Sequence, residues 1–230
     1  MKILVTGADG FIGSHLTESL VRHGHDVRAF VFYNSFNSWG WLESFPAEKL
    51  SGIEVFSGDI RDPNGVRTAM SGCDIVFHLA AYNHVGDSFK HVFENVNSNL
   101  LSTVNLLNHG PKIKKLIHMG TSEIYGIQKV LPFNTNEKAN PMSPYGVTKY
   151  ASELFSLLKS KSSNLNLLCV RPFNTFGPFQ SEKAIIPEMI IKCLQNKEIK
   201  KVGEPRKFNF IPLSHDILGV NLKQIDFETQ

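Results

Sequence analysis

Three glycines between an apolar run and an amphipathic run constrain the fold of this chain most strongly. Residues 6–13 read T-G-A-D-G-F-I-G, directly after the apolar run of residues 2–5 and before an amphipathic stretch that ends at Gly24. In such a strand–turn–helix, the glycines allow a tight turn, close approach of a pyrophosphate and close packing of the helix on the strand. The helix N-terminus then offers N–H groups to phosphates. The predicted cofactor-binding residues of this turn are Gly7, Asp9, Gly10, Phe11, Ile12 and Gly13.

Short apolar runs alternate with amphipathic stretches along most of the chain. Strands are predicted at 2–7, 26–33, 53–59, 73–81, 113–120 and 165–173, and helices at 11–24, 63–70, 143–160 and 184–196, with a long helix from about Asp87 or Phe93 to Asn108. Nearly continuous apolar strands that alternate with helices are typical of a parallel sheet covered on both faces. Right-handed crossovers then make the predicted fold class α/β, a doubly wound parallel sheet of the Rossmann type.

The alternation loosens near residue 170. The stretches 171–183 and 201–216 are rich in Pro, Gly and Asn, and we expect them to be loops over the carboxyl ends of the strands, where ligands bind in such sheets. The sequence therefore predicts a dinucleotide-binding domain over residues 1–170 and a partial substrate-binding region over residues 171–230.

Composition excludes several classes of protein. The formal net charge of +3 is too small to indicate nucleic-acid binding. Three widely spaced cysteines without a CxxC pair predict reduced, mostly buried thiols in a cytoplasmic protein. The nine histidines show no metal-ligand spacing, so no metal site is expected. We expect neither a signal peptide nor a membrane-spanning segment, because no apolar run is long enough.

The end of the second predicted strand leaves the choice of cofactor open. An acidic residue there usually holds the adenosine ribose of NAD, but residues 30–38 read F-V-F-Y-N-S-F-N-S. Asn34 and Ser35 could hydrogen-bond NAD or NADP. Asp59, followed by Ile60, could reach the adenine or could simply stabilise a turn. The segment after the fourth strand adds three more candidate cofactor-binding residues, Leu79, Ala80 and Ala81.

A tyrosine and a lysine with catalytic spacing begin the helix predicted at 143–160. Tyr145 and Lys149 are four residues apart, so they share one helix face. A lysine ammonium beside a phenol favours the phenolate, which would make Tyr145 an acid or base near neutral pH. Such a pair is common by chance, but it gains weight from the glycine turn and from the polar residues Thr121, Ser122 and Glu123 at the end of the fifth strand.

Six motifs together resemble one family. They are TGADGFIGSHL (6–16), GDIRD (58–62), HLAA (78–81), TSEIYG (121–126), SPYGVTK (143–149) and RPFNTFGP (171–178). As a set they are similar to the extended short-chain dehydrogenases/reductases, in the NAD-dependent epimerase/dehydratase group that acts on nucleotide sugars. The Thr-Ser-Glu segment resembles GDP-mannose 4,6-dehydratases, and residues 29–42 look like enzymes of bacterial surface-sugar pathways such as those leading to legionaminic acid.

The resemblance implies a redox-neutral dehydration that gives a 4-keto-6-deoxy sugar for surface polysaccharide. Tyr145 with Lys149 would take the proton of the sugar O4, and Thr121 would hydrogen-bond O4. Glu123 would remove the C5 proton before water leaves from C6. Ser122 stands where related enzymes carry an acidic aspartate, so the proton donor for the leaving hydroxyl is either protonated Glu123 or water. A purely structural Glu123 is the alternative.

The resemblance also implies partners and further site residues. A nucleotide sugar would be held by Asn99, Asn174 and Arg206, although Asn99 could instead support the active-site helix or lie on a helix surface. The cofactor would be tightly bound NAD or NADP, and a homodimer would form through helices at about 90–108 and 144–160. Family members are usually much longer, so the substrate-binding part is expected to be truncated. A 4-epimerase, a reductase and an inactive dinucleotide-binding homologue are the alternative functions.

Overall fold

The computed structural model describes residues 1–127, 134–198 and 210–212, the last three by their backbone only. One compact unit comprises residues 1–172, and the described residues from Phe173 onward belong to a second unit. The domain boundary predicted from the sequence lies at residue 170. Arg206, a predicted substrate-binding residue, lies outside the described residues.

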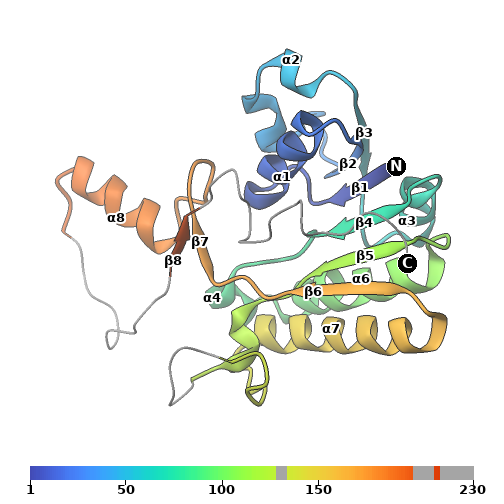
Figure 1. Cartoon of the computed structure of the whole chain (residues 1–230). Coiled ribbons are helices and arrows are strands. Elements are labelled where there is room, and N and C mark those ends of the chain that lie inside the picture. Colours follow the sequence, from blue (N-terminus) through green and yellow to red (C-terminus); the bar gives the residue numbers. More distant parts are fainter. Residues whose placement is uncertain (128–133, 199–209, 213–230) are drawn as a thin grey trace. The chain divides into compact units, whose positions relative to one another are not determined.

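The first unit contains a sheet of six parallel strands in the order β3-β2-β1-β4-β5-β6 (Figure 1). The strands are β1 Lys2–Thr6, β2 Asp26–Phe32, β3 Ile53–Gly58, β4 Ile75–His78, β5 Lys115–Met119 and β6 Asn166–Val170. Strands β2 and β3 are added on one side of β1, and strands β4, β5 and β6 on the other side. Ligands of doubly wound sheets bind at the carboxyl ends of the strands where this order switches, between β1 and β4. The predicted Rossmann-type fold is confirmed.

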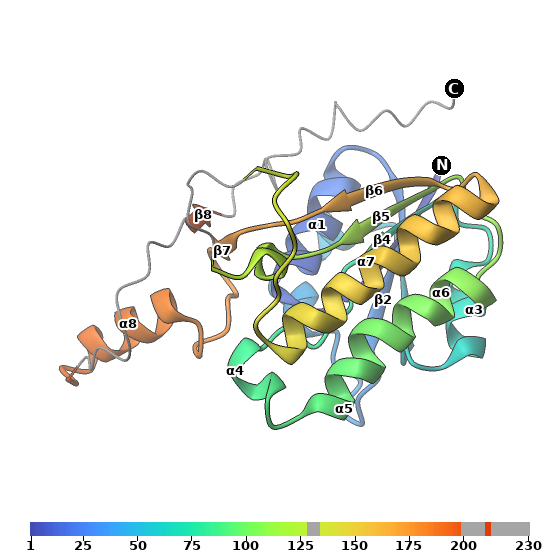
Figure 2. The same cartoon turned by 90° about the horizontal axis from the view of Figure 1, so that it is seen from below.

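Helices cover both faces of this sheet. They are α1 Phe11–Arg22, α2 Ala47–Leu50, α3 Pro63–Met70, α4 Val85–Ser88, α5 Val92–Asn95, α6 Ser102–His109 and α7 Pro144–Ser163, with 3₁₀ turns η1 Gly40–Ser44 and η3 Ser122–Tyr125. Helices α6 and α7 lie side by side in front of the sheet in Figure 2, while α1 lies behind it. Helix α3 packs against α6 on the same face. This arrangement is what right-handed crossovers require.

Local sequence explains where two of the helices begin. The Asp62 carboxylate accepts hydrogen bonds from the backbone N–H groups of Asn64 and Gly65 at the start of α3. The Ser143 hydroxyl accepts one from the N–H of Gly146 at the start of α7. Each cap is followed by a proline in the first turn, where a missing N–H does no harm. The Ser143 cap fixes the start of α7, the helix that carries Tyr145 and Lys149.

An apolar cluster lies between the sheet and the helices α3 and α6. Its buried members are Leu4, Phe30, Val66, Ala69, Met70, Cys73, Val76, Leu106, Leu107, Ile113 and Leu116. Burial of such side chains stabilises the fold by about 1.5–3 kcal/mol each. This core anchors β1 and β4, whose carboxyl ends carry the glycine turn and the segment 79–81.

The predicted long helix before β5 is interrupted. Helices α4 and α5 are separate short segments, and a π-helical stretch, η2 Val96–Leu101, joins α5 to α6. The side-chain amide of Asn99 is hydrogen-bonded to Tyr82 and to Thr148. The backbone carbonyl oxygen of Asn99 accepts a hydrogen bond from Ser152 Oγ at 2.7 Å. These long-range contacts favour a wider turn than an α-helix has, and such turns often occur at functional sites.

The second unit contains two short strands that the sequence analysis expects to be loops. Strands β7 Asn174–Phe176 and β8 Phe210–Pro212 pair in parallel, and α8 Ile185–Leu194 lies between them in the chain. These strands were not predicted because each has only three residues, which is too short for a recognisable alternating pattern, and because the surrounding Pro, Gly and Asn residues are typical of loops.

The cysteines are free, as predicted, but they are less buried than predicted: Cys73 is buried, Cys169 partly exposed and Cys193 exposed. Within the described part of the chain, no helix has the length and apolar character to cross a membrane. No cluster of three or more potential metal ligands occurs there either.

Candidate active site

The glycine turn after β1 has the geometry of a phosphate-binding turn. Gly7 has a φ of +70°, and a Cβ atom there would lie 2.9 Å from the backbone N and Cα of Ala80. A Cβ atom on Gly13 would lie 2.0 Å from the carbonyl oxygen of Gly7. Helix α1 begins at Phe11, and its N-cap residue, Gly10, provides no side-chain cap. The backbone therefore leaves the first N–H groups of α1 open to an anion, as the fold of a dinucleotide site requires.

A small pocket lies beside this turn at the carboxyl ends of β1, β2 and β3. The Thr6 hydroxyl accepts hydrogen bonds from the N–H groups of Leu79 and Ala80, both at 3.1 Å, and so holds the segment after β4 against the turn. The predicted residues of the turn and of segment 79–81 are thus brought together. The pocket is lined by Gly7, Asp9, Phe30, Val31, Phe32, Gly58, Ile60 and Ala80.

Two of the predicted cofactor residues, Asn34 and Asp59, bind other parts of the protein, and a third, Ser35, is exposed. The Asn34 side-chain oxygen accepts hydrogen bonds from the N–H groups of Phe36 and Ser38, and its amide donates to Ser38 O, so Asn34 shapes its own loop. Ser35 is exposed in that loop. Both carboxylate oxygens of Asp59 bind the Arg61 guanidinium at 2.6–3.0 Å, which lowers the pKa of Asp59. The turn interpretation of Asp59 is favoured, and its adenine contact stays a prediction.

The structure brings Thr121, Glu123 and Tyr145 together at the end of β5. The Thr121 hydroxyl accepts a hydrogen bond from the N–H of Glu123 at 3.2 Å, which starts the turn η3. The same threonine side chain is hydrogen-bonded to the phenol of Tyr145. Glu123 is only partly exposed, and its charge acts on Tyr145. Ser122 lies between Thr121 and Glu123 and is held through its N–H by Pro172 O at 3.0 Å.

Burial changes the acid–base properties of Tyr145 and Lys149 against the prediction. The sequence predicts that Lys149 favours the phenolate, but burial raises the pKa of Tyr145 to about 12, and the nearby Glu123 charge adds to the rise. The hydrogen bond with Thr121 lowers the pKa of Tyr145, but it offsets only part of the rise caused by burial. Burial also lowers the pKa of Lys149 to about 8, against a rise from the Glu153 charge. Desolvation therefore outweighs the attraction that the spacing of the pair suggests.

Asn99 supports the helix of Tyr145. The side chain is 1% exposed, and its oxygen accepts a hydrogen bond from the N–H of Tyr82 at 2.7 Å. Its amide donates to Tyr82 O, to Asn95 Oδ1 and to Thr148 Oγ1 on α7. With both donors used within the protein, the supporting role is favoured over the predicted substrate contact and over a surface position.

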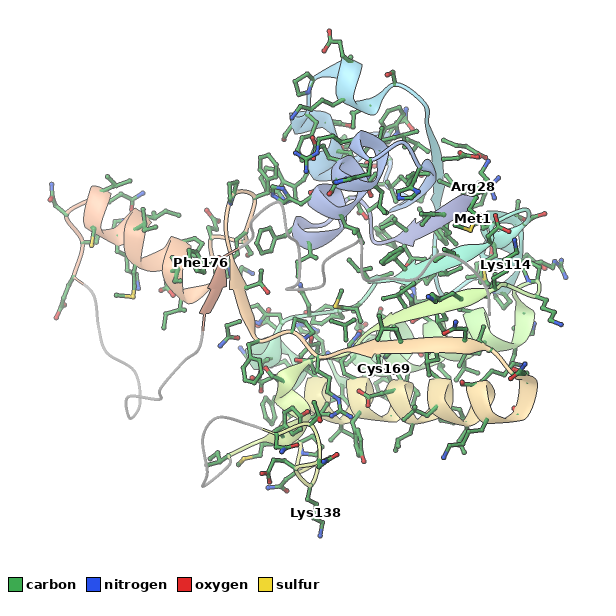
Figure 3. All side chains as sticks on the ribbon, in the orientation of Figure 1. Met1, Arg28, Lys114, Lys138, Cys169 and Phe176 are labelled. Atoms are coloured by element: carbon green, nitrogen blue, oxygen red, sulfur yellow. The ribbon has the colours of Figure 1, made fainter. Side chains whose placement is uncertain are left out.

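A buried ion pair that the sequence analysis missed lies one turn beyond Lys149. Arg171 binds both carboxylate oxygens of Glu153, at 3.0 and 2.5 Å, and donates to the hydroxyl of Tyr125 at 2.6 Å. Cys169 on β6 lies beside α7 (Figure 3), and burial together with the Glu153 charge raises its pKa to about 12. Glu153 follows Lys149 by four residues, so the two share one face of α7. This spacing was the signal in the sequence that could have predicted a buried Glu153.

This ion pair also restricts the size of the residue at position 120. A Cβ atom on Gly120 would lie 3.0 Å from Val170 O and 3.2 Å from the Glu153 carboxylate. A larger residue at this position would crowd the ion pair. Because Arg171 also holds Tyr125 at the end of η3, the pair fixes the turn that carries Glu123.

Removal of the arginine is expected to destabilise the protein strongly. Arg171→Met leaves the carboxylate of Glu153, which is 1% exposed, without its partner. We expect a loss of about 3–5 kcal/mol in the free energy of unfolding, measured by urea denaturation. The control Lys114→Met breaks a more exposed ion pair with Asp74 and should change the free energy of unfolding by less than about 1 kcal/mol. Similar losses for both variants would contradict the structural role of the buried pair.

Two buried histidines, on β4 and β5, lie close enough to Lys149 for its charge to act on them. His78 is hydrogen-bonded to Thr6 Oγ1 at 2.9 Å and to Thr103 Oγ1 at 3.0 Å, which ties β4 to β1 and α6. Burial and the Lys149 charge lower its pKa to about 3. His118, next to it on β5, is fully buried, and neither ring nitrogen has a hydrogen-bond partner among the described residues. Both rings are therefore neutral in the folded protein.

Asn174, a predicted substrate-binding residue, begins β7 in the second unit, and its side chain is exposed. Its role stays a prediction.

Comparison with known proteins agrees with this geometry. A model of the NAD dependent epimerase/dehydratase family matches residues 3–211. The chain belongs to this family. It is 32% identical over 217 residues to dTDP-D-glucose 4,6-dehydratase of Dictyostelium discoideum, a match that covers 86% of this chain and 49% of the relative. It is 29% identical over 231 residues to dTDP-glucose 4,6-dehydratase of Streptomyces antibioticus, covering 96% of this chain and 68% of the relative.

Solved structures of epimerases are also similar. UDP-glucose 4-epimerase of Thermotoga maritima, with UDP-glucose, superimposes with a TM-score of 0.85 at 26% identity, covering 98% of this chain and 74% of the epimerase. UDP-glucuronic acid 4-epimerase of Bacillus cereus, with UDP-glucuronic acid and NAD, gives a TM-score of 0.80 at 29% identity, covering 93% of this chain and 69% of the epimerase. The chain spans about half the length of the Dictyostelium relative.

Proposed function

We propose that this protein is a nucleotide-sugar 4,6-dehydratase. One observation carries the proposal: a partly buried carboxylate, Glu123, follows β5 on the turn η3, beside a threonine that is hydrogen-bonded to Tyr145. A dehydration needs a base for C5 in addition to a base for O4, and Glu123 and Tyr145 supply two separate proton acceptors. The dehydratase names of the two sequence relatives support the proposal.

Tyr145 takes the proton from the sugar O4, and Thr121 orients both the phenol and O4. With a pKa of about 12, Tyr145 is protonated in the protein alone, so the phenolate needs additional positive charge in the site. Lys149 supplies one charge when protonated. Its lowered pKa, about 8, means that the proton of Lys149 is held weakly and can be passed on.

The residues of the glycine turn and of segment 79–81 fit a dinucleotide, which we propose they hold with its pyrophosphate at the start of α1. The chemistry supplied by a bound nicotinamide is reversible hydride transfer, from sugar C4 at first and to C6 at the end. Tyr145 and Lys149 lie on the first two turns of α7, where they can contact both the nicotinamide ribose and the sugar.

Glu123 removes the C5 proton once C4 is a ketone, because the ketone makes that proton acidic. The hydroxyl on C6 then leaves as water and takes a proton as it goes. Ser122 is a weak acid. We propose that Glu123 carries the proton from C5 to the leaving hydroxyl, since it is the acidic residue of the turn η3.

One observation favours a 4-epimerase as the second candidate. Ser122 offers no acid for a leaving hydroxyl, and an epimerase needs none. The structural similarity to two epimerases agrees with this alternative. Glu123 would then have a structural role.

The substrate and the reaction can be tested together. We would incubate the purified protein with GDP-mannose, GDP-GlcNAc, UDP-GlcNAc and dTDP-glucose, each with NAD or NADP, and follow the products by mass spectrometry. A dehydratase gives a product lighter by one water from one of these donors. An unchanged mass with an inverted C4 centre, seen by NMR, would replace the dehydratase by the epimerase.

We also propose a homodimer formed through α6 and α7, which lie side by side in Figure 2. The outer face of α7 exposes Val147, Leu154, Phe155 and Leu158, at helical spacing. Leu101, the last residue of η2 before α6, is also exposed. Apolar side chains in one continuous row on a helix surface favour burial against a partner.

Leu158→Glu is expected to give a monomer. Leu158 is 64% exposed in the single chain, so a charge there is tolerated by the monomer and rejected by an apolar dimer interface. The molar mass, measured by light scattering, should fall by about half. The control Phe36→Glu, in the loop after β2 and 89% exposed, should leave the mass unchanged. A wild-type protein that is already monomeric would contradict the proposed dimer.

A further inference from the structure

The end of β2 lacks the acid that usually binds the adenosine ribose, and the neighbouring polar residues do not replace it. Phe32 and Tyr33 occupy the strand end and are exposed. Asn34 uses its oxygen and its amide to hold its own loop, as described above. A ribose bound at this pocket therefore needs its hydrogen-bond acceptor from another part of the chain.

Asp9 lies in the middle of the glycine turn that follows β1, and its side chain reaches the end of the neighbouring strand β2. Its Oδ2 atom accepts a hydrogen bond from the N–H of Phe32 at 3.3 Å, and both residues line the pocket beside the turn. The carboxylate is therefore located at the end of β2, although it belongs to the segment after β1. Since a carboxylate has about four acceptor positions, the bond to Phe32 leaves others for a ligand.

The segment after β2 holds Asp9 firmly. The N–H of Trp41 donates to Asp9 O at 3.1 Å. Gly40 approaches so closely that a Cβ atom there would lie 2.6 Å from Asp9 O and 3.0 Å from Asp9 Cβ. Burial raises the pKa of Asp9, and its backbone hydrogen bonds, including that to Phe32, lower it. The carboxylate is thus fixed in position at the wall of the pocket.

The charges around the pocket disfavour a phosphate. The guanidinium of Arg61 lies 6.0 Å from the centre of the Phe32 ring at this strand end. Asp59 neutralises that guanidinium through both carboxylate oxygens. Asp9 forms no ion pair with any residue that the structure describes, and its negative charge would repel the 2′-phosphate of NADP.

We propose that Asp9 selects NAD over NADP in this protein, by accepting hydrogen bonds from the adenosine ribose and repelling a 2′-phosphate at the end of β2. The inference rests on the dinucleotide site that belongs to the proposed function. It does not depend on which sugar reaction follows, and its test uses no sugar nucleotide. A failed dehydratase assay and a failed cofactor test therefore remain distinguishable.

The test compares the binding of NADH and NADPH to cofactor-free protein by fluorescence titration. Wild type should bind NADPH at least about tenfold more weakly than NADH. Asp9→Asn keeps an oxygen that accepts from Phe32 N–H but loses the charge, so it should reduce this ratio of dissociation constants by about tenfold. Asp9→Ser is a second, smaller neutral variant and should change the ratio in the same direction.

Arg61→Gln serves as the matched control, because it removes the cation that lies over the Phe32 ring, and it should change the ratio by less than about threefold. Equal binding of NADH and NADPH by wild type, an unchanged ratio in both Asp9 variants, or loss of both dinucleotides in both variants would overturn the proposal. The last result would assign Asp9 to holding the loop alone. A selective loss of NADPH binding in Arg61→Gln would overturn it in favour of Arg61.

Discussion

Tyr145→Phe is expected to lower kcat for the sugar nucleotide by about 10²- to 10⁴-fold, the range that general acid–base groups contribute. The phenol is buried and hydrogen-bonded to Thr121, so it can act on O4 without competition from water. Phenylalanine keeps the ring packing and removes only the hydroxyl. The measurement is single-turnover conversion of the donor found by mass spectrometry, with the protein saturated by cofactor.

The control for this variant is cofactor binding. NADH titration should give dissociation constants for Tyr145→Phe and wild type within about threefold, because the variant keeps the proposed contacts of the glycine turn to the phosphates and of Lys149 to the nicotinamide ribose. Near wild-type kcat in Tyr145→Phe would remove the phenol from the chemistry. A comparable loss of cofactor binding and activity would indicate a disturbed site and not a lost acid–base group.

Glu123→Gln is expected to stop the reaction after its first half. Oxidation at C4 depends on Tyr145, whereas removal of the C5 proton depends on Glu123, so the variant should accumulate the 4-keto sugar together with reduced dinucleotide. We expect product formation to fall by about 10²- to 10⁴-fold. Stopped-flow absorbance of the reduced dinucleotide should rise in the variant and persist.

Ser122→Ala is the matched control on the same turn. A hydroxyl is a poor acid, so this variant should lose less than about tenfold in product formation. Wild-type rates in Glu123→Gln would give Glu123 a structural role. A loss of C4 oxidation as well as of product would show that the glutamate acts before the C5 step, which contradicts the proposed order.

The parts of the structure that the sequence predicted are those set by local pattern. The glycines at 7, 10 and 13 need a turn of one shape, and Pro63 and Pro144 mark helix starts within the first turn. The spacing of Tyr145 and Lys149 places them on one face of α7 because four residues make about one helical turn.

The parts that could not be predicted depend on contacts between distant segments. The interruption at Asn99 follows from bonds to Tyr82 and Ser152, which lie 17 and 53 residues away in the chain. The carboxylate of Asp9 reaches the end of β2 only because β1 and β2 are neighbours in the sheet. The raised pKa of Tyr145 reflects burial, which the sequence spacing does not contain.

The most direct test of the proposed dehydration is the mass of the product formed in D₂O. Loss of the C5 proton to Glu123 and its later replacement from solvent predict a 4-keto-6-deoxy product that has lost one water and gained one carbon-bound deuterium. The deuterium should remain after transfer to H₂O at acidic pH, where exchange next to the ketone is slow. A product of unchanged mass without deuterium would contradict the dehydratase and support an epimerase.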